Sequence, residues 1–112
     1  MRDALIVSTA RTPLTKSYRG TFNNTTAPTM AGWAIEEAVK RSEVDPDKVD
    51  DVIMGAALQQ GTTHANVARN AALAAGLPVT VSGMSLDRQC SSGMMAIATA
   101  AKQIISDGMD VV

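Results

Sequence analysis

Short apolar runs alternate with longer amphipathic stretches along this chain of 112 residues. The apolar runs have the length and the β-branched content of strands that are buried in a sheet. These runs are Ala4–Val7, Val52–Leu58, Val79–Leu86 and a shorter run that starts at Asp110 and reaches Val112. In the stretches between them, apolar residues recur at the spacing of a helix with one apolar face. The pattern predicts the order βαβαβα, followed by the start of a fourth strand.

Turn and capping residues delimit the three predicted helices. These helices are expected to follow Thr26, to span Asn66 to Ala75, and to span Ser91 to Ser106. Thr26 is an expected N-cap with Pro28 in the first helical turn. Gly76 and Gly108 are expected to end the second and third helices. Strands that alternate with helices predict an α/β fold with a parallel sheet and right-handed crossovers.

The third predicted strand and the end of the chain both depart from the usual pattern. Thr80, Ser82 and Ser85 make the strand polar for a place inside a parallel sheet, so we expect it at a sheet edge. The chain then stops as a buried strand begins, although domains normally end at a solvated surface. A sheet of three strands and a stub leaves an edge that a further strand should cover. We therefore expect residues 1–112 to be the N-terminal part of a larger protein.

Composition narrows the classes of function. The net charge is -1 and aromatic residues are 3% of the chain, which argues against a nucleic-acid surface. The first apolar run is too short for a signal peptide or a membrane span, so a soluble cytoplasmic protein is expected. The single cysteine cannot form an intrachain disulfide, which fits a reducing compartment. Asp50 and Asp51 lack a surrounding set of oxygen ligands and are interpreted as solvated residues before a strand, so no metal site is expected.

Cys90 has the most informative position in the chain. It lies where the third predicted strand gives way to the third predicted helix. Its thiol therefore faces the unpaired N–H groups and the partial positive charge of a helix N-terminus. This setting favours the thiolate, which is the nucleophilic form. The alternative is that Cys90 is a small buried hydrophobic residue, as most free cysteines are.

Several other side chains are candidate functional groups. His64, the only histidine, could act as a ligand or base, but a solitary loop histidine is more often a surface residue. Arg69 and Arg88 could contact phosphate groups or could hold a loop by hydrogen bonds, and we favour the second role. Methionines on either side of Cys90 are interpreted as adaptable core packing rather than as a substrate surface. They are Met84, Met94 and Met95.

The segment Asp87–Ile97 reads D-R-Q-C-S-S-G-M-M-A-I and resembles the acyl-enzyme cysteine motif of thiolases, N-R-x-C-x-S-G-x-x-A-I. Its one departure is Asp87, where the motif usually has Asn. Thr9–Pro13 resembles the thiolase opening strand and its exit. Gly55–Gly61, followed by Asn66–Arg69, resembles the second strand and the start of its helix. The segments occur in the order of the family and extend over essentially the whole chain.

The resemblance implies a thiolase-like layered α/β fold, of which this chain would be an incomplete first half. Residues 1–112 would form the N-terminal part of the thiolase N-terminal domain, without the loop domain and the C-terminal domain. The implied activity is acyl transfer between coenzyme A thioesters through an acyl-cysteine on Cys90, in the formation or cleavage of acetoacetyl-CoA or a 3-ketoacyl-CoA. The thioester is the substrate, and no separate cofactor is expected.

The resemblance also implies roles around Cys90 and an assembly. N–H groups at the start of the following helix would stabilise an oxyanion, and Gly93 would let substrate or a neighbouring segment come close. Thiolases activate this cysteine with a histidine from their C-terminal half, so turnover by this chain alone is not expected. A homodimer or homotetramer is expected, because the strand equivalent to Val79–Leu86 pairs with its twin. The alternatives are a non-catalytic fragment that pairs with a partner chain and a ketoacyl-synthase relative.

Overall fold

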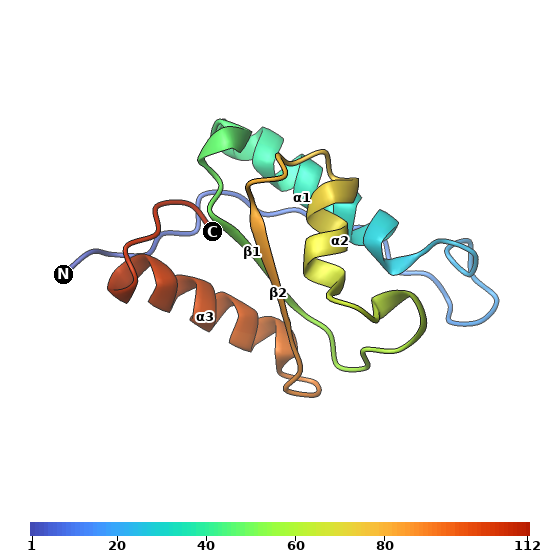
Figure 1. Ribbon diagram of the computed structural model, residues 1–112. Coiled ribbons are helices and arrows are strands. Elements are labelled where there is room, and N and C mark those ends of the chain that lie inside the picture. Colours follow the sequence, from blue (N-terminus) through green and yellow to red (C-terminus); the bar gives the residue numbers. More distant parts are fainter.

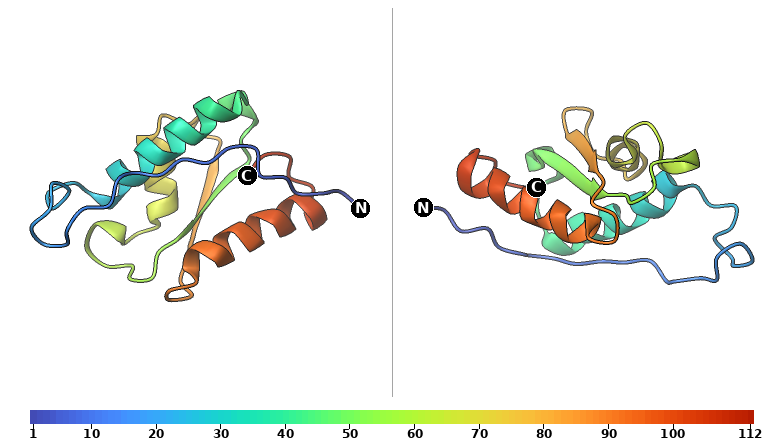
Figure 2. Two further views of the ribbon diagram at one scale, coloured as in Figure 1. Left: turned by 180° about the vertical axis from the view of Figure 1, so that it is seen from behind. Right: turned by 90° about the horizontal axis from the view of Figure 1, so that it is seen from below.

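The computed structural model describes residues 1–112 and arranges them in three layers (Figure 1). The middle layer is a sheet of two parallel strands, β1 (Asp51–Gly55) and β2 (Ser82–Leu86). Helix α3 (Ser92–Ser106) lies on one side of this sheet, and α1 (Ala27–Ser42) and α2 (Val67–Ala74) lie on the other (Figures 1 and 2). Two short 3-10 helices, η1 (Pro46–Lys48) and η2 (Gly61–Thr63), lie in the connections. The layered α/β class is confirmed.

The unit formed by β1, α2 and β2 has the parallel strands that the alternating pattern predicts. Its register pairs Asp51 with Ser82 and Gly55 with Leu86. Because β2 pairs with β1 alone, its other edge is free, in agreement with the polar residues that place it at an edge. Because β1 and β2 are parallel, both strands end at the same end of the sheet, and the connection from β2 to α3 begins there (Figure 1).

The helix boundaries follow the capping residues. Thr26 is the N-cap of α1, and Pro28 lies in the first turn. Asn66 caps α2, with its side-chain oxygen accepting from the backbone N–H of Arg69. Gly76 and Gly108 lie just beyond α2 and α3 with φ angles of 78° and 83°, a left-handed conformation that glycine adopts without steric cost. The three helix predictions are confirmed, with small differences at the ends.

The core lies between α1, α2 and the sheet. Its buried centre consists of Ala72, Leu77 and Val81, and it is surrounded by the half-buried apolar side chains of Ile35, Val39, Val49, Val52 and Ala75. Gly32 brings α1 close to α2, because a Cβ built at this position would lie 3.1 Å from the Cβ of Ala74. The helix pair and the sheet thus form one packed body, and α3 adds to the opposite face.

The prediction of a buried strand at Ala4–Val7 is wrong for this structure. The segment is extended but belongs to no strand, and Leu5, Ile6 and Val7 are 75%, 76% and 68% exposed. It runs past α1 (Figure 2). There the Ser8 hydroxyl donates to the carbonyl of Ala38, and Arg41 donates to the carbonyl of Thr9. An apolar run becomes a strand only where a neighbouring strand accepts and donates its backbone hydrogen bonds. The sheet consists of β1 and β2 alone, and Ala4–Val7 forms no backbone ladder with the unpaired edge of either strand.

The predicted start of a fourth strand at Asp110–Val112 is also absent. Asp50 N–H donates to the carbonyl of Val111 at 2.8 Å, so the segment does reach the beginning of β1. Its other hydrogen bonds to the start of β1 involve a side chain. The Asp50 carboxylate accepts from the N–H groups of Asp110 and Val111 at 2.8 and 3.1 Å. One backbone bond does not make a ladder, and the side chain of Asp50 takes the place of a second strand partner.

Both observed strands are shorter than predicted. β1 begins at Asp51 and ends at Gly55, and the residues that follow lead to an exposed Leu58. The backbone N–H of Val81 donates to the carbonyl of Pro78, so residues 78–81 form a turn and β2 starts at Ser82. No helix of the chain combines the length and the apolar character needed to span a membrane.

Candidate active site

Cys90 lies in the turn that connects β2 to α3, just before the first residue of that helix (Figure 1). The residue is exposed and its thiol is free. The interpretation of Cys90 as a small buried hydrophobic residue is therefore wrong. The thiol is accessible at the end of the sheet where both strands finish, which is where parallel α/β sheets generally bind their ligands.

The backbone before Cys90 turns sharply. Gln89 has a φ of 53°, in the left-handed region that residues other than glycine seldom adopt. The N–H groups of Ser91 and Ser92 donate to the carbonyls of Arg88 and Gln89, each at 3.1 Å. These two hydrogen bonds close a turn that contains Cys90 and links Arg88 and Gln89 to the start of α3.

Ser92 holds the same turn with its side chain. It is 4% exposed, and its hydroxyl accepts from the N–H of Arg88 at 2.9 Å while it donates to the carbonyl of Gln89 at 2.6 Å. Ser92 occupies the serine position of the cysteine motif, which is the one signal in the sequence that marks it. Neither its burial nor its bonding partners can be seen from residue spacing.

The end of β1 packs directly against the start of α3. A Cβ built on Gly55 would lie 2.5 Å from both the nitrogen of Gly93 and the carbonyl oxygen of Ser92, closer than real Cβ contacts come. Glycine at position 55 is therefore required for this approach. A Cβ built on Gly93 meets no atom within 4 Å, so the suggestion that Gly93 admits a neighbouring segment is not supported by any contact, and the space beside it is open.

The two arginines have different surroundings. Arg69 donates from Nη2 to the carbonyl of Val79 at 3.0 Å and from Nη1 to the carbonyl of Val81, which confirms its predicted role in holding a loop. Arg88 is exposed, and its side chain makes no hydrogen bond to the chain, so its role stays open. His64 is exposed at the end of η2, as expected for a surface residue.

Asp50 and Asp51, at the start of β1, are not simply solvated, contrary to expectation. Asp51 is 6% exposed, and its carboxylate accepts from the N–H of Val52 at 2.8 Å and from Gln103 of α3 at 3.1 Å. Asp50 is exposed, and the backbone N–H groups of Val111 and Asp110 lower the pKa of its carboxyl below the ordinary value. Both residues serve as hydrogen-bond acceptors that tie other segments to the beginning of β1.

The interpretation of the methionines as core packing is wrong for Met84 and Met94, which are 36% and 75% exposed. Met94 lies in the first turn of α3, and Ile97 one turn further is 60% exposed. The buried residues of α3 are instead Ser92 and Ala96. An apolar stripe with helical spacing therefore faces solvent beside Cys90.

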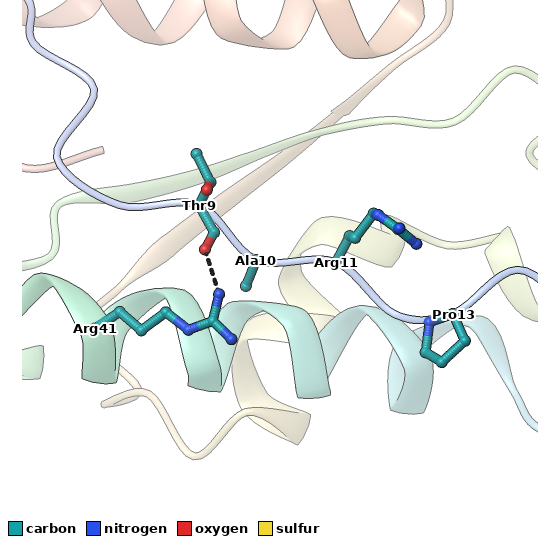
Figure 3. Close-up of a pocket in the computed structure, with 5 residues that line it drawn as sticks. All are labelled: Thr9, Ala10, Arg11, Pro13 and Arg41. Carbon is teal, nitrogen blue, oxygen red and sulfur yellow. Dashed lines mark hydrogen bonds between the residues drawn. The ribbon is translucent and has the colours of Figure 1, made fainter.

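Two cavities lie on the side of the chain that carries the N-terminal segment. One of about 590 Å³ is bounded by Thr9, Ala10, Arg11, Pro13 and Arg41 (Figure 3). The Arg41 guanidinium donates to the carbonyl of Thr9 at 2.9 Å, while the Arg11 side chain extends away from Arg41. The other, of about 570 Å³, is mostly apolar and lies between this segment, α1 and the end of β1, with Gly55 and Met54 in its wall. Neither is lined by a residue of the Cys90 turn.

Comparison with known proteins agrees with the motif and the fold. The family profile described as "Thiolase, N-terminal domain" matches residues 4–112. The chain is 40% identical to a 3-ketoacyl-CoA thiolase of Saccharophagus degradans and 37% identical to one of Psychrobacter sp.. The crystal structure of the Bacillus anthracis acetyl-CoA acetyltransferase superposes with a TM-score of 0.86 at 47% identity and covers 93% of this chain.

The chain belongs to the thiolase family. The resemblance seen in the sequence is thereby confirmed, and membership supports an acyltransferase of the thiolase type. The alignments cover 98% of this chain but 28% of each of the two relatives, and the structural match covers 26% of the Bacillus anthracis chain. The chain thus spans about a quarter of the length of the thiolases that it matches.

The one departure from the thiolase cysteine motif has a clear structural account. The Oδ1 atom of Asp87 accepts from the N–H of Gln89 at 2.8 Å, so the side chain forms a local turn just before Cys90. An asparagine at this position has a carbonyl oxygen at the same place and can accept the same bond. The substitution of Asp for the usual Asn therefore leaves the acceptor of this thiolase turn in place.

Proposed function

We propose that Cys90 is the acyl-accepting nucleophile of a thiolase-type acyltransferase that moves an acetyl or longer acyl group between coenzyme A thioesters. The observation that supports this most directly is the exposed thiol in the β2–α3 turn, within the family's cysteine motif. On this proposal, residues 1–112 form the N-terminal part of a thiolase N-terminal domain. The substrate is the thioester itself, in the formation or cleavage of acetoacetyl-CoA or a 3-ketoacyl-CoA.

In the direction of formation, the chemistry begins with attack of the Cys90 thiolate on the carbonyl carbon of the thioester. The bond between that carbon and the sulfur of coenzyme A breaks, the coenzyme leaves as a thiol after taking up a proton, and the acyl group stays on Cys90. A second substrate then accepts the acyl group and regenerates the thiolate. Because one thioester replaces another, neither direction of the exchange is strongly favoured.

Backbone N–H groups at the start of α3 are suited to stabilise the oxyanion of this step. The N–H groups of Gly93 and Met94 donate to no acceptor within the chain, since the first hydrogen bonds of the helix come from later residues. One such donor typically contributes about 3 kcal/mol to the transition state. The open space at Gly93 leaves room for the thioester to approach these groups.

The nucleophile needs a base, and His64 is the only histidine among these residues. A nucleophile and its activator act as a unit, and the exposed His64 makes no hydrogen bond to Cys90. We therefore propose that these 112 residues do not turn over by themselves and that a complete thiolase provides the activating group.

The test is intact-mass spectrometry after exposure to acetyl-CoA. The chain is compared with a chimera in which it replaces the matching N-terminal segment of the Bacillus anthracis acetyl-CoA acetyltransferase. We expect one acetyl group on the chimera at Cys90, none on its Cys90→Ser variant, and much slower acetylation of the chain alone. A folded chimera that gains no acetyl group, or gains it in the Cys90→Ser variant, would contradict the proposal.

A second proposal concerns assembly. We infer a homodimer formed through the free edge of β2, because this strand pairs with β1 on one side alone and exposes Ser82 and Met84. Sedimentation should then show a dimer that Met84→Lys weakens, since charges on a strand edge oppose pairing. Pairing with a different chain, as a non-catalytic fragment, is the rival, and a strictly monomeric chain that gains no acetyl group would favour it. A cytoplasmic location and a role in fatty acid metabolism accompany the enzymatic proposal.

A further inference from the structure

The hydroxyl of Ser92 is unusual in this chain because it is buried and fully engaged. Asp51 and Ser92 are the only polar or charged residues with buried side chains, at 6% and 4% exposure. Both hydrogen bonds of the Ser92 hydroxyl go to backbone groups of the residues immediately before Cys90. Cys90 therefore lies between Ser92 and the two residues that the Ser92 hydroxyl bonds.

The backbone that Ser92 holds is one that would not persist without support. Gln89 is left-handed, and it directly precedes Cys90, so a change in its backbone angles would redirect the Cys90 side chain. The Ser92 hydroxyl accepts the N–H of Arg88 and donates to the carbonyl of Gln89, while Asp87 accepts the N–H of Gln89. All three hydrogen bonds hold the backbone of Arg88 and Gln89, the two residues that set the position of Cys90.

The end of β1 holds the same turn from the other side. The space that a Cβ at Gly55 would need is occupied by the backbone of Ser92 and Gly93, so the first turn of α3 cannot shift toward the sheet. The side chain of Ser92 and the backbone of Gly55 thus restrain the turn from two independent elements.

We propose that Ser92 is a positioning residue for Cys90: its buried hydroxyl keeps the Arg88–Gln89 backbone in the conformation that places the thiol at the N-terminus of α3. The inference rests on the proposed function of Cys90 as a nucleophile. A helix N-terminus generally favours thiolate over thiol, so a turn that relaxes without the hydroxyl should make the thiol less reactive.

The test uses the single cysteine of the chain as its own reporter. The rate of Cys90 alkylation by iodoacetamide at neutral pH is measured for the parent, Ser92→Ala, Ser92→Thr and Ser91→Ala. Ser91 is the matched control because its hydroxyl donates one bond to the carbonyl of Arg88 but is exposed and holds no backbone N–H. Circular dichroism and urea unfolding show for each variant that the fold is retained.

We expect Ser92→Ala to slow alkylation about threefold or more, because the relaxed turn no longer holds the thiol at the N-terminus of α3. Ser92→Thr, which keeps the hydroxyl, should restore most of the rate, and Ser91→Ala should leave it unchanged. A merely structural role would loosen the turn, expose the thiol further and leave alkylation equal or faster. A folded Ser92→Ala chain with the parent rate would overturn the proposal.

Gly55→Ala provides a second variant in case Ser92→Ala fails to fold. The added methyl group must push the Ser92–Gly93 backbone away from β1, so the same slowing of alkylation is expected from the opposite side. If Gly55→Ala folds and reacts at the parent rate, the proposal fails. Alkylation requires no acyl transfer. A slowed rate in the Ser92→Ala chain, together with a chimera that is never acetylated, would leave this inference standing while the missing acetylation overturned the proposed function.

Discussion

Four residues around the thiol, Asp87, Gln89, Ser92 and Gly93, have clearly different tasks at the scale of single side chains and backbone groups. Asp87 and Ser92 supply the acceptors and the donor that shape the turn, Gln89 takes up the unusual backbone angle, and Gly93 leaves space. Asp87, Gln89 and Ser92 need not contact a substrate for their effect, whereas Gly93 lies where we place the thioester. Substitutions here should therefore separate effects on the turn from effects on the chemistry.

Asp87→Asn should change little, because the asparagine oxygen can accept the N–H of Gln89 in the same way. Asp87→Ala removes the acceptor and should lower the free energy of unfolding by about 1 kcal/mol, as the loss of one hydrogen bond usually does. Urea unfolding of the two variants measures the difference. Equal stability of both variants would show that the bond to Gln89 is unimportant.

Gly93→Ala should leave the fold intact, because a Cβ at this position meets no atom within 4 Å. Replacing a helical glycine with alanine should even raise the free energy of unfolding, by up to about 1 kcal/mol. Acetylation of Cys90 in the chimera should nevertheless become slower, since the methyl group occupies space that we assign to the thioester. The two readouts are thermal unfolding and the mass assay, and an unchanged acetylation rate would argue against that assignment.

At the scale of elements, the structure depends on a few polar links between α2 and the strand that follows it. The side chain of Asn66 donates to the carbonyl of Gly83 at 2.9 Å, and the Ser85 hydroxyl accepts the N–H of Ala68 at 3.0 Å. Arg69 adds two bonds to the carbonyls of Val79 and Val81. A Cβ at Gly83 would lie within 3 Å of the backbone of Arg69, so helix and strand also touch directly.

Arg69→Met should destabilise the chain, because it leaves the carbonyls of Val79 and Val81 without their charged donor while it keeps an apolar stem. Hydrogen bonds to charged groups typically contribute about 1.5–3 kcal/mol each, and partial exposure of this arginine favours the lower end for the pair. Urea unfolding gives the value, with Arg88→Met as the matched control because that side chain makes no hydrogen bond to the chain. A similar loss in both variants would contradict the assigned role.

At the scale of the whole molecule, both terminal segments are held by side chains rather than by sheet pairing. Arg2 forms an ion pair with Asp110, Ser8 and Arg41 attach the N-terminal segment to α1, and Asp50 attaches the C-terminal segment to β1. Leu5 and Ile6 stay largely exposed as a result. The termini should therefore respond to conditions that leave the central layers unchanged.

The attachment of the C-terminal segment should depend on pH. Hydrogen bonds from Val111 and Asp110 lower the pKa of Asp50, so its ionised form is favoured in the folded chain. The resulting stabilisation is fully present above the ordinary aspartate value of about 4 and is lost as the pH falls through the lower folded value. The NMR shifts of the two amide protons should follow this titration, and in an Asp50→Asn variant they should not. Amide proton shifts that do not change with the titration of the Asp50 carboxyl would contradict the prediction.

Local features could be predicted from the sequence because their causes lie within a few residues. Thr26 and Pro28 start α1, glycines end α2 and α3, and the motif around Cys90 places the thiol at a strand-to-helix turn. The parallel pairing of β1 and β2 follows from the alternation of strands and helices. These outcomes depend on backbone propensity and periodicity, which adjacent residues determine.

Other features depended on which distant residues come together, and only the folded chain shows this. The apolar run Ala4–Val7 had the composition of a buried strand, yet it lies exposed and forms no ladder with either strand of the sheet. Asp51 is buried because Gln103 of α3 reaches it, and Ser92 is buried because β1 packs against its helix. Burial and hydrogen-bond partners depend on the packing of elements far apart in sequence, whereas helix limits and the position of Cys90 are local properties of the chain.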